Sequence, residues 1–207
     1  LTHSQVVHNG IIENHRALRE RIDGDYRSQT DTEVIVHLFE QSLAMQSSDD
    51  DAALTAFRLT LDALEGAYAI LLVTETRPGE IFFARQGSPL QVALVGDSCH
   101  FASSDAPLIG VVSEAVYLED GDWGVATSKS LRLFDRQGEP AEPGSRPLPT
   151  TTAAAQKEGF RFFMEKEIYE QGAIVTDILA GRLLDDCLQL DELPEGWLGR
   201  FSSITLC

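Results

Sequence analysis

The stretch VVHNGIIENH, residues 6–15, carries an Asn-Gly pair between apolar residues, which is the strongest short-range signal for a tight β-hairpin turn. The residues that follow the turn signal, ENHRALRERI, have helical spacing and lack the alternation of a returning strand. Two interpretations of Asn9 and Gly10 are therefore open. They form a plain turn, which the dipeptide alone favours, or they offer a side-chain amide and a backbone N–H to an oxyanion.

Three helices are predicted after the start of this stretch. Asn14 is a suitable N-cap for a helix over residues 15–22, with Gly24 as its end. Thr30 and Glu33 have the spacing of a capping box ahead of a second helix. A third helix is expected over residues 52–64. The predicted apolar faces of the second and third helices are Val34, Ile35, Leu38 and Phe39, and Leu54, Phe57, Leu61 and Leu64, respectively.

From Ala67 onward the hydrophobic pattern is that of short strands separated by turn residues. The strand-like runs are AYAILLVTET, IFFAR, LQVALVG, CHFASS, AVYLED, WGVAT and LRLFD. They predict an antiparallel meander after the helices, and hence an α+β fold. Residues 136–155, rich in Pro, Gly, Thr and Ala, are expected to be an exposed linker. Residues 160–183 look helical, with a possible division near Gln171 and Gly172.

Composition limits the classes of partner. The chain has 207 residues, of which 43% are hydrophobic, and a formal net charge of -17. This charge argues against nucleic acid or an anionic membrane as a partner. No apolar run approaches the ~20 residues that span a bilayer, and no signal peptide is evident. Three cysteines without zinc spacing favour a reducing, cytoplasmic setting, and no metal or cofactor is expected.

Few side chains carry an isolated signal for chemistry. Asp31 falls in the first turn of a predicted helix, where a carboxylate either complements the helix dipole or binds a ligand ammonium group. Arg85 opens the sequence RQGSPL, which we interpret as a structural corner. The histidines have no metal-ligand spacing, and we expect each to be structural. None of Cys99, Cys187 and Cys207 has a local sign of activation as a nucleophile.

Taken in order, several segments resemble the glutamine–fructose-6-phosphate aminotransferase branch of the class II glutamine amidotransferases. They are VVHNGIIENHRALRE, SQTDTEVIVHL, EGAYAILL, ARQGSPL, FASSDAPL, VYLEDGDWGV and FFMEKEIYEQ. The resemblance covers nearly the whole chain. It implies a partial glutaminase domain over residues 1–135, an interdomain segment over residues 136–200 and the first strand of a sugar-isomerase domain over residues 201–207. Both ends look cut, so we expect a segment of a longer polypeptide.

The resemblance also implies a fold and a site. The fold would be part of a four-layer αββα N-terminal-nucleophile hydrolase, with antiparallel sheets and a helical C-terminal segment. The Asn9 side chain and the Gly10 N–H would form the oxyanion hole, and Asp31 would bind the α-ammonium group of glutamine. The nucleophile of this family is an N-terminal cysteine, which we do not find in the chain, so the segment alone is expected to be inactive. Gly172 stands where the family commonly has proline.

For the full-length enzyme, the resemblance implies glutamine and fructose 6-phosphate as substrates and a homodimer as the assembly. Two other functions are compatible with the residues. One is a non-catalytic module that binds glutamine or a partner through Asn9, Gly10 and Asp31. The other is a different class II glutamine amidotransferase, against which the KEIYEQ segment argues.

Overall fold

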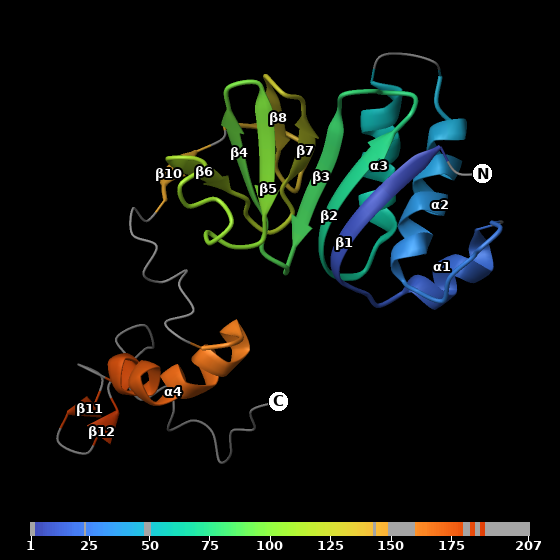
Figure 1. The fold of residues 1–207 in the computed structure, drawn as a ribbon. Coiled ribbons are helices and arrows are strands. Elements are labelled where there is room, and N and C mark those ends of the chain that lie inside the picture. The colour runs from blue at the N-terminus through green and yellow to red at the C-terminus, as the bar shows by residue number, and fades with distance from the viewer. Residues whose placement is uncertain are drawn as a thin grey trace. The chain divides into compact units, whose positions relative to one another are not determined.

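The chain forms two compact units, Leu1–Ala155 and Gln156–Cys207. The computed structural model describes residues 3–22, 24–47, 51–142, 144–148, 160–179, 183–184 and 187–188 (Figure 1). Within these residues, no helix combines the length and the apolar character needed to cross a membrane.

The first unit begins with an edge strand and three helices. These are β1 (Ser4–Ile12), α1 (His15–Arg21), α2 (Thr32–Ala44) and α3 (Ala52–Ala63). The predicted helices are confirmed, and Val34, Ile35 and Phe39 of α2 are fully buried. α2 and α3 lie beside β1, β2 and β3 (Figure 1). Their apolar faces are therefore buried against one face of a sheet.

The predicted helix caps are wrong in detail. Asn14 is the N-cap residue of α1, but its side chain makes no cap hydrogen bond. Its amide instead donates to the Ala63 carbonyl at 2.9 Å and accepts from the Glu65 N–H at 3.2 Å. Asp31, rather than Thr30, is the N-cap residue of α2. The Asn14 amide, which the local sequence predicted to cap α1, thus forms hydrogen bonds with the connection between α3 and β2 instead.

The predicted strands are present, but they form two sheets instead of one meander. The strands are β2 (Gly66–Thr74), β3 (Ile81–Gln86), β4 (Gln91–Val95), β5 (Ser98–Ala102), β6 (Glu114–Tyr117), β7 (Trp123–Ala126), β8 (Leu131–Phe134), β9 (Pro140–Ala141) and β10 (Ser145–Pro147). One sheet has the order β1-β2-β3-β7-β8-β9, and the other has the order β10-β6-β4-β5. The chain leaves the first sheet after β3, builds most of the second, and returns at β7 beside β3.

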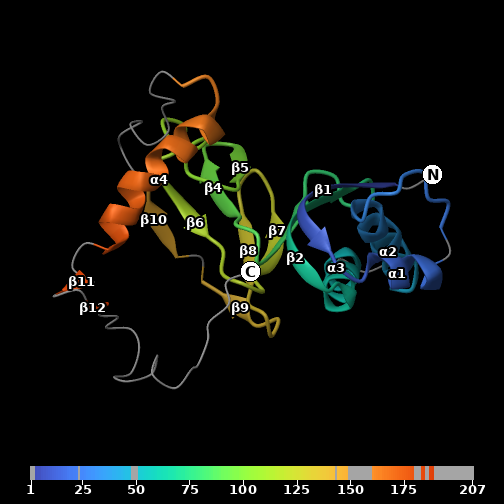
Figure 2. The same cartoon turned by 90° about the horizontal axis from the view of Figure 1, so that it is seen from below.

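Two of the three apolar clusters among the described residues lie between layers of secondary structure. The first contains side chains from the helices and one face of the six-stranded sheet, including Phe39, Phe57, Ile70 and Phe82. The second contains Phe83 and Val92, which come from different sheets, so the sheets pack face to face. Figure 2 shows β4, β5 and β6 beside β7 and β8, with α2 and α3 near β1 and β2. The described residues of the first unit thus form three successive layers: helices, sheet and sheet.

Most described residues of the segment 136–148 are exposed, as expected, but this part is not an unstructured linker, because β9 pairs with β8 and β10 pairs with β6. The second unit contains α4 (Phe163–Leu179), β11 (Leu183–Leu184) and β12 (Cys187–Leu188). α4 is one continuous helix through Gly172, so the suggested division there is also wrong. The domain boundaries at 135 and 200 stay predictions, and residues 201–207 lie outside the described part of the chain.

Candidate active site

Asn9 and Gly10 lie within β1 rather than in a turn. Strand pairing with β2 is continuous along β1, with Asn9 opposite Ala69 and Gly10 opposite Tyr68. Gly10 has a φ of 138°, and a Cβ atom built on it would lie 2.0 Å from the Ala67 carbonyl oxygen. The hairpin-turn interpretation is therefore wrong. Glycine is required at this position because the neighbouring backbone leaves no room for a side chain.

The pairing pattern decides which backbone groups of β1 stay open. The Glu13 N–H donates to the Glu65 carbonyl at 2.8 Å, and the Glu75 N–H donates to the His3 carbonyl at 3.0 Å. Because hydrogen-bonded pairs alternate in an antiparallel ladder, odd-numbered residues of β1 bond to β2. The N–H groups of Gly10 and Ile12 therefore face away from β2, at the edge of the described sheet.

Asp31 lies at this same edge. Its Oδ2 atom accepts a hydrogen bond of 2.8 Å from the Ile12 N–H. Residues 10 and 12 are about 7 Å apart along a strand, so the carboxylate lies roughly that far from the Gly10 N–H. The structure thus brings together all three residues that the sequence analysis selected. Their roles as oxyanion donors and ammonium acceptor stay predictions.

A second contact joins the same two elements. The Nδ1 atom of His8 is hydrogen-bonded to the Thr32 hydroxyl at 3.1 Å. Burial lowers the pKa of His8, and the negative charge of Asp31 only partly offsets this effect. The fold therefore favours the neutral form of the His8 imidazole. Sequence reasoning assigned His8 only a structural role and gave Thr32 no role in chemistry. The one available signal was that His8 adjoins Asn9 and Thr32 adjoins Asp31 in the sequence.

The loop that leads to Asp31 is held by Glu33. Its carboxylate accepts hydrogen bonds of 2.7 Å from the N–H groups of Arg27 and Ser28, and another of 2.7 Å from the Ser28 hydroxyl. Burial alone would raise the pKa of Glu33, but these hydrogen bonds and the nearby His37 lower it to about 2. The capping-box prediction therefore identified Glu33 as a side chain that accepts backbone hydrogen bonds, but the partners that it implied were wrong.

Asn9 shares the outer face of β1 with exposed apolar side chains. Asn9 is exposed, as are Val7 and Ile11 on either side of it, with 68% and 65% of their surfaces accessible. In β2, Val73 is 41% exposed. Val73 pairs with Gln5 of β1, so it lies on this same outer face. Among the described residues, the second sheet covers the β3–β7–β8 part of the first sheet and extends to Ala69 of β2, whereas Val7, Ile11 and Val73 stay accessible.

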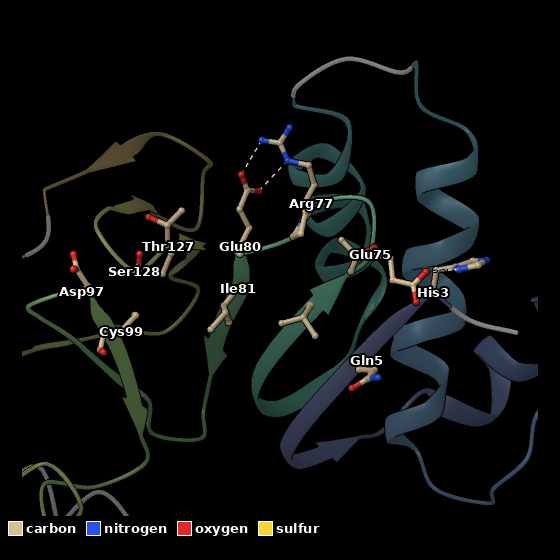
Figure 3. A pocket seen from close by; sticks show the side chains of 16 residues that line it. His3, Gln5, Glu75, Arg77, Glu80, Ile81, Asp97, Cys99, Thr127 and Ser128 are labelled. Carbon is tan, nitrogen blue, oxygen red and sulfur yellow. Dashed lines mark hydrogen bonds and ion pairs between the residues drawn. The ribbon is translucent and has the colours of Figure 1, made fainter.

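A separate cleft of about 540 Å³ lies over the first residues of β1 and β3 (Figure 3). Its charged groups are paired with each other or with neighbours. His3 contacts Glu75 at 2.9 Å, and Arg77 contacts Glu80 at 2.8 Å. Cys99 also lines the cleft, and burial raises the pKa of its thiol to about 11. The Cys99 thiol is therefore not activated, as predicted from the sequence.

The remaining candidates have structural roles. Arg85 donates to the carbonyls of Ser88 at 3.2 Å and Leu118 at 2.6 Å, so the RQGSPL segment is a corner as predicted. No group of three or more potential metal ligands occurs within the described ranges. The side chains of Cys187 and Cys207 lie outside the described part of the chain.

Residues 2–109 match the model of a glutamine amidotransferase domain family. That segment is just over half of the chain and includes β1, the start of α2 and all three candidate residues. The chain belongs to the glutamine amidotransferase family. The resemblance inferred from HNGIIENH and TDTEV is thereby confirmed at the level of this domain.

Two similar relatives indicate which branch of the glutamine amidotransferase family the chain resembles. The chain is 39% identical over 209 residues to glutamine–fructose-6-phosphate aminotransferase (isomerizing) of Campylobacter jejuni, covering 99% of this chain and 34% of that protein. It is 41% identical over 181 residues to the enzyme of the same name from Pseudomonas aeruginosa, covering 86% and 29%. The chain spans about a third of the length of these relatives.

A solved structure supports the fold. Glutamine phosphoribosylpyrophosphate amidotransferase from B. subtilis matches with a TM-score of 0.53 and 26% identity, over 64% of this chain and 29% of that one. The predicted α+β class and N-terminal-nucleophile hydrolase fold are therefore confirmed. Of the four layers expected, the described residues of the first unit form the three named above.

Proposed function

We propose that the chain is part of a glutamine–fructose-6-phosphate aminotransferase. The protein would hydrolyse glutamine and transfer the released ammonia to fructose 6-phosphate, making glucosamine 6-phosphate. The identities of 39% and 41% to aminotransferases support this acceptor over phosphoribosylpyrophosphate, whose amidotransferase matches at 26%. In keeping with the relatives' greater length, the proposal places the nucleophile and the isomerase site in other segments of the natural protein.

The observation that carries the proposal is the hydrogen bond between Ile12 N–H and Asp31 Oδ2. It fixes a carboxylate beside the strand that contains Asn9 and Gly10. An extended glutamine places its ammonium nitrogen about 6 Å from its carboxamide oxygen, over five bonds of about 1.5 Å each. That length is comparable with the spacing of about 7 Å between Asp31 and the Gly10 N–H.

Each residue would then have a distinct effect on the reaction. Attack on the carboxamide carbon places negative charge on its oxygen, and the Asn9 amide and Gly10 N–H would donate hydrogen bonds to that charge. The second carboxylate oxygen of Asp31 would bind the α-ammonium group in both ground and transition states. Asn9 would therefore act mainly on kcat, and Asp31 mainly on KM for glutamine.

The full-length protein tests these roles by its release of glutamate from glutamine and its formation of glucosamine 6-phosphate. We expect Asn9→Ala to lower kcat about 10²–10³-fold. We expect Asp31→Asn to raise KM for glutamine about 10–100-fold, because a charged hydrogen bond is lost while an acceptor for Ile12 remains. Gln5→Ala is the control, since this exposed side chain lies on the same face of β1.

The outcomes separate the candidate functions. Glutamine binding without glutamate release by the full-length protein would favour the non-catalytic module. Ammonia transfer to phosphoribosylpyrophosphate, but not to fructose 6-phosphate, would place the protein in another amidotransferase branch. A homodimer and a cytoplasmic location complete the proposal, and a sedimentation measurement and cell fractionation test them.

A further inference from the structure

Two hydrogen bonds join β1 to the start of α2, and they enclose the proposed oxyanion donors along the strand. His8 Nδ1 contacts Thr32 Oγ1 at 3.1 Å on one side of Asn9 and Gly10. Ile12 N–H contacts Asp31 Oδ2 at 2.8 Å on the other side. In both, a residue of β1 meets a residue at the beginning of α2. The position of α2 along β1 is therefore set at two points rather than one.

His8 is poorly explained by stability alone. Its ring is partly buried, and the Nε2 atom is buried without a hydrogen-bond partner among the described residues. A buried polar atom that lacks a partner reduces stability. An apolar side chain would avoid that cost at this position of β1. What the imidazole adds is the contact with Thr32, next to Asp31.

The geometry points to His8 and Thr32 as positioning residues for the glutamine site. We propose that their hydrogen bond holds the start of α2 against β1, and so sets the distance between the Asp31 carboxylate and the Asn9 and Gly10 donors. This inference rests on the proposed glutaminase function. Neither residue needs to touch the substrate, because each acts through its neighbour in the chain.

A fixed distance between the donors and the carboxylate would select the length of the substrate. Asparagine is one methylene shorter than glutamine, so it cannot reach both groups unless α2 shifts along β1. Loss of the His8–Thr32 contact would allow such shifts. Glutamine would then bind less tightly, and the preference for glutamine over asparagine would fall.

The test uses the full-length protein and four variants. Thr32→Val keeps the shape of the side chain but removes the hydroxyl, whereas Thr32→Ser keeps the hydroxyl. His8→Phe removes the ring nitrogens. Thr55→Val is the matched control, because Thr55 is an exposed threonine on α3. Initial rates of glutamate or aspartate release are measured with glutamine and with asparagine, and thermal unfolding midpoints show whether each variant is folded.

We expect Thr32→Val and His8→Phe to raise KM for glutamine about five- to tenfold, the effect of losing one hydrogen bond, with kcat within about threefold. The ratio of kcat/KM values for glutamine and asparagine should fall by a similar factor. Thr32→Ser should stay within about twofold of the natural protein, as should Thr55→Val. If His8→Phe does not fold, the comparison of Thr32→Val with Thr32→Ser decides alone.

Three results would overturn the inference. They are an unchanged KM and an unchanged asparagine ratio in Thr32→Val, a loss confined to kcat, or an equal defect in Thr32→Ser. In each of these cases the natural protein still hydrolyses glutamine, so the proposed function stands. A natural full-length protein without any glutaminase activity would instead overturn both proposals.

Discussion

Replacement of Glu33 by glutamine should loosen the loop that leads to Asp31. The carboxylate accepts three hydrogen bonds of 2.7 Å, from the N–H groups of Arg27 and Ser28 and from the Ser28 hydroxyl. A glutamine keeps one oxygen acceptor but directs an NH₂ group toward the other donors. Hydrogen bonds to charged groups contribute about 1.5–3 kcal/mol each. We expect a net loss of about 2 kcal/mol, or about 30-fold in the local opening equilibrium.

Amide hydrogen exchange, read by mass spectrometry on peptides covering residues 24–34 of the full-length protein, measures this opening directly. Exchange should be about 30-fold faster in Glu33→Gln. Glu20→Gln, an exposed position on α1, removes the same charge and should leave the rate within about twofold. Equal exchange in Glu33→Gln and the natural protein would refute the reasoning.

The stability that Glu33 gives to this loop depends on pH. The pKa of the Glu33 carboxyl is lowered from 4.5 to about 2, so the folded state favours the ionised carboxylate. The contribution of Glu33 to stability is therefore fully present above about pH 4.5, and it is lost as pH falls toward 2. After correction for intrinsic exchange, the difference between the natural protein and Glu33→Gln should shrink over that range. A difference that is constant between pH 5 and 2 would contradict this assignment.

Three further substitutions or modifications test other parts of the structure. Gly10→Ala should destabilise the protein by about 3 kcal/mol or more, since the new Cβ atom would lie 2.0 Å from the Ala67 carbonyl oxygen. Gly79→Ala is the control: the space around Gly79 is open, so this change should cost only about 1–2 kcal/mol. Thermal unfolding measures both. Arg85→Gln should lower stability by about 2 kcal/mol in urea unfolding, because two backbone carbonyls lose a charged donor; an unchanged midpoint would contradict the corner role. The thiol of Cys99 has a pKa of about 11 in the folded protein, against the ordinary 9.0. Cys99 should therefore react with iodoacetamide at pH 8 about 100-fold more slowly in the folded protein than in the urea-unfolded protein. Comparable rates in the two states would contradict the burial of this thiol.

Local patterns predicted most of the secondary structure. The apolar face of α2, including Val34, Ile35 and Phe39, follows from helical spacing, and its burial is confirmed. The seven strand-like runs from Ala67 onward are also strands. These predictions succeed because the period of apolar residues along a chain depends on backbone geometry, which is a local property.

Errors arose where the hydrogen-bonding partner came from outside the predicted element. Asn9 and Gly10 have the sequence of a tight turn, but β2 pairs with β1 through these positions and keeps the strand extended. Asn14 and Glu33 were expected to cap helices, yet their hydrogen bonds go to the α3–β2 connection and to the loop before Asp31. Local propensity was overridden in each case by a hydrogen bond that only the folded chain makes available.

The sequence by itself determined the elements, the α+β class and, through resemblance, the family and the identity of Asn9, Gly10 and Asp31 as candidate residues. Only the tertiary structure decided which strands belong to each of the two sheets, that the Ile12 N–H fixes Asp31 beside β1, and that His8 meets Thr32. The physical reason is that spacing along the chain encodes which face of an element is apolar. It does not encode which edge N–H or hydroxyl a side chain will meet, because that depends on how the packed elements align.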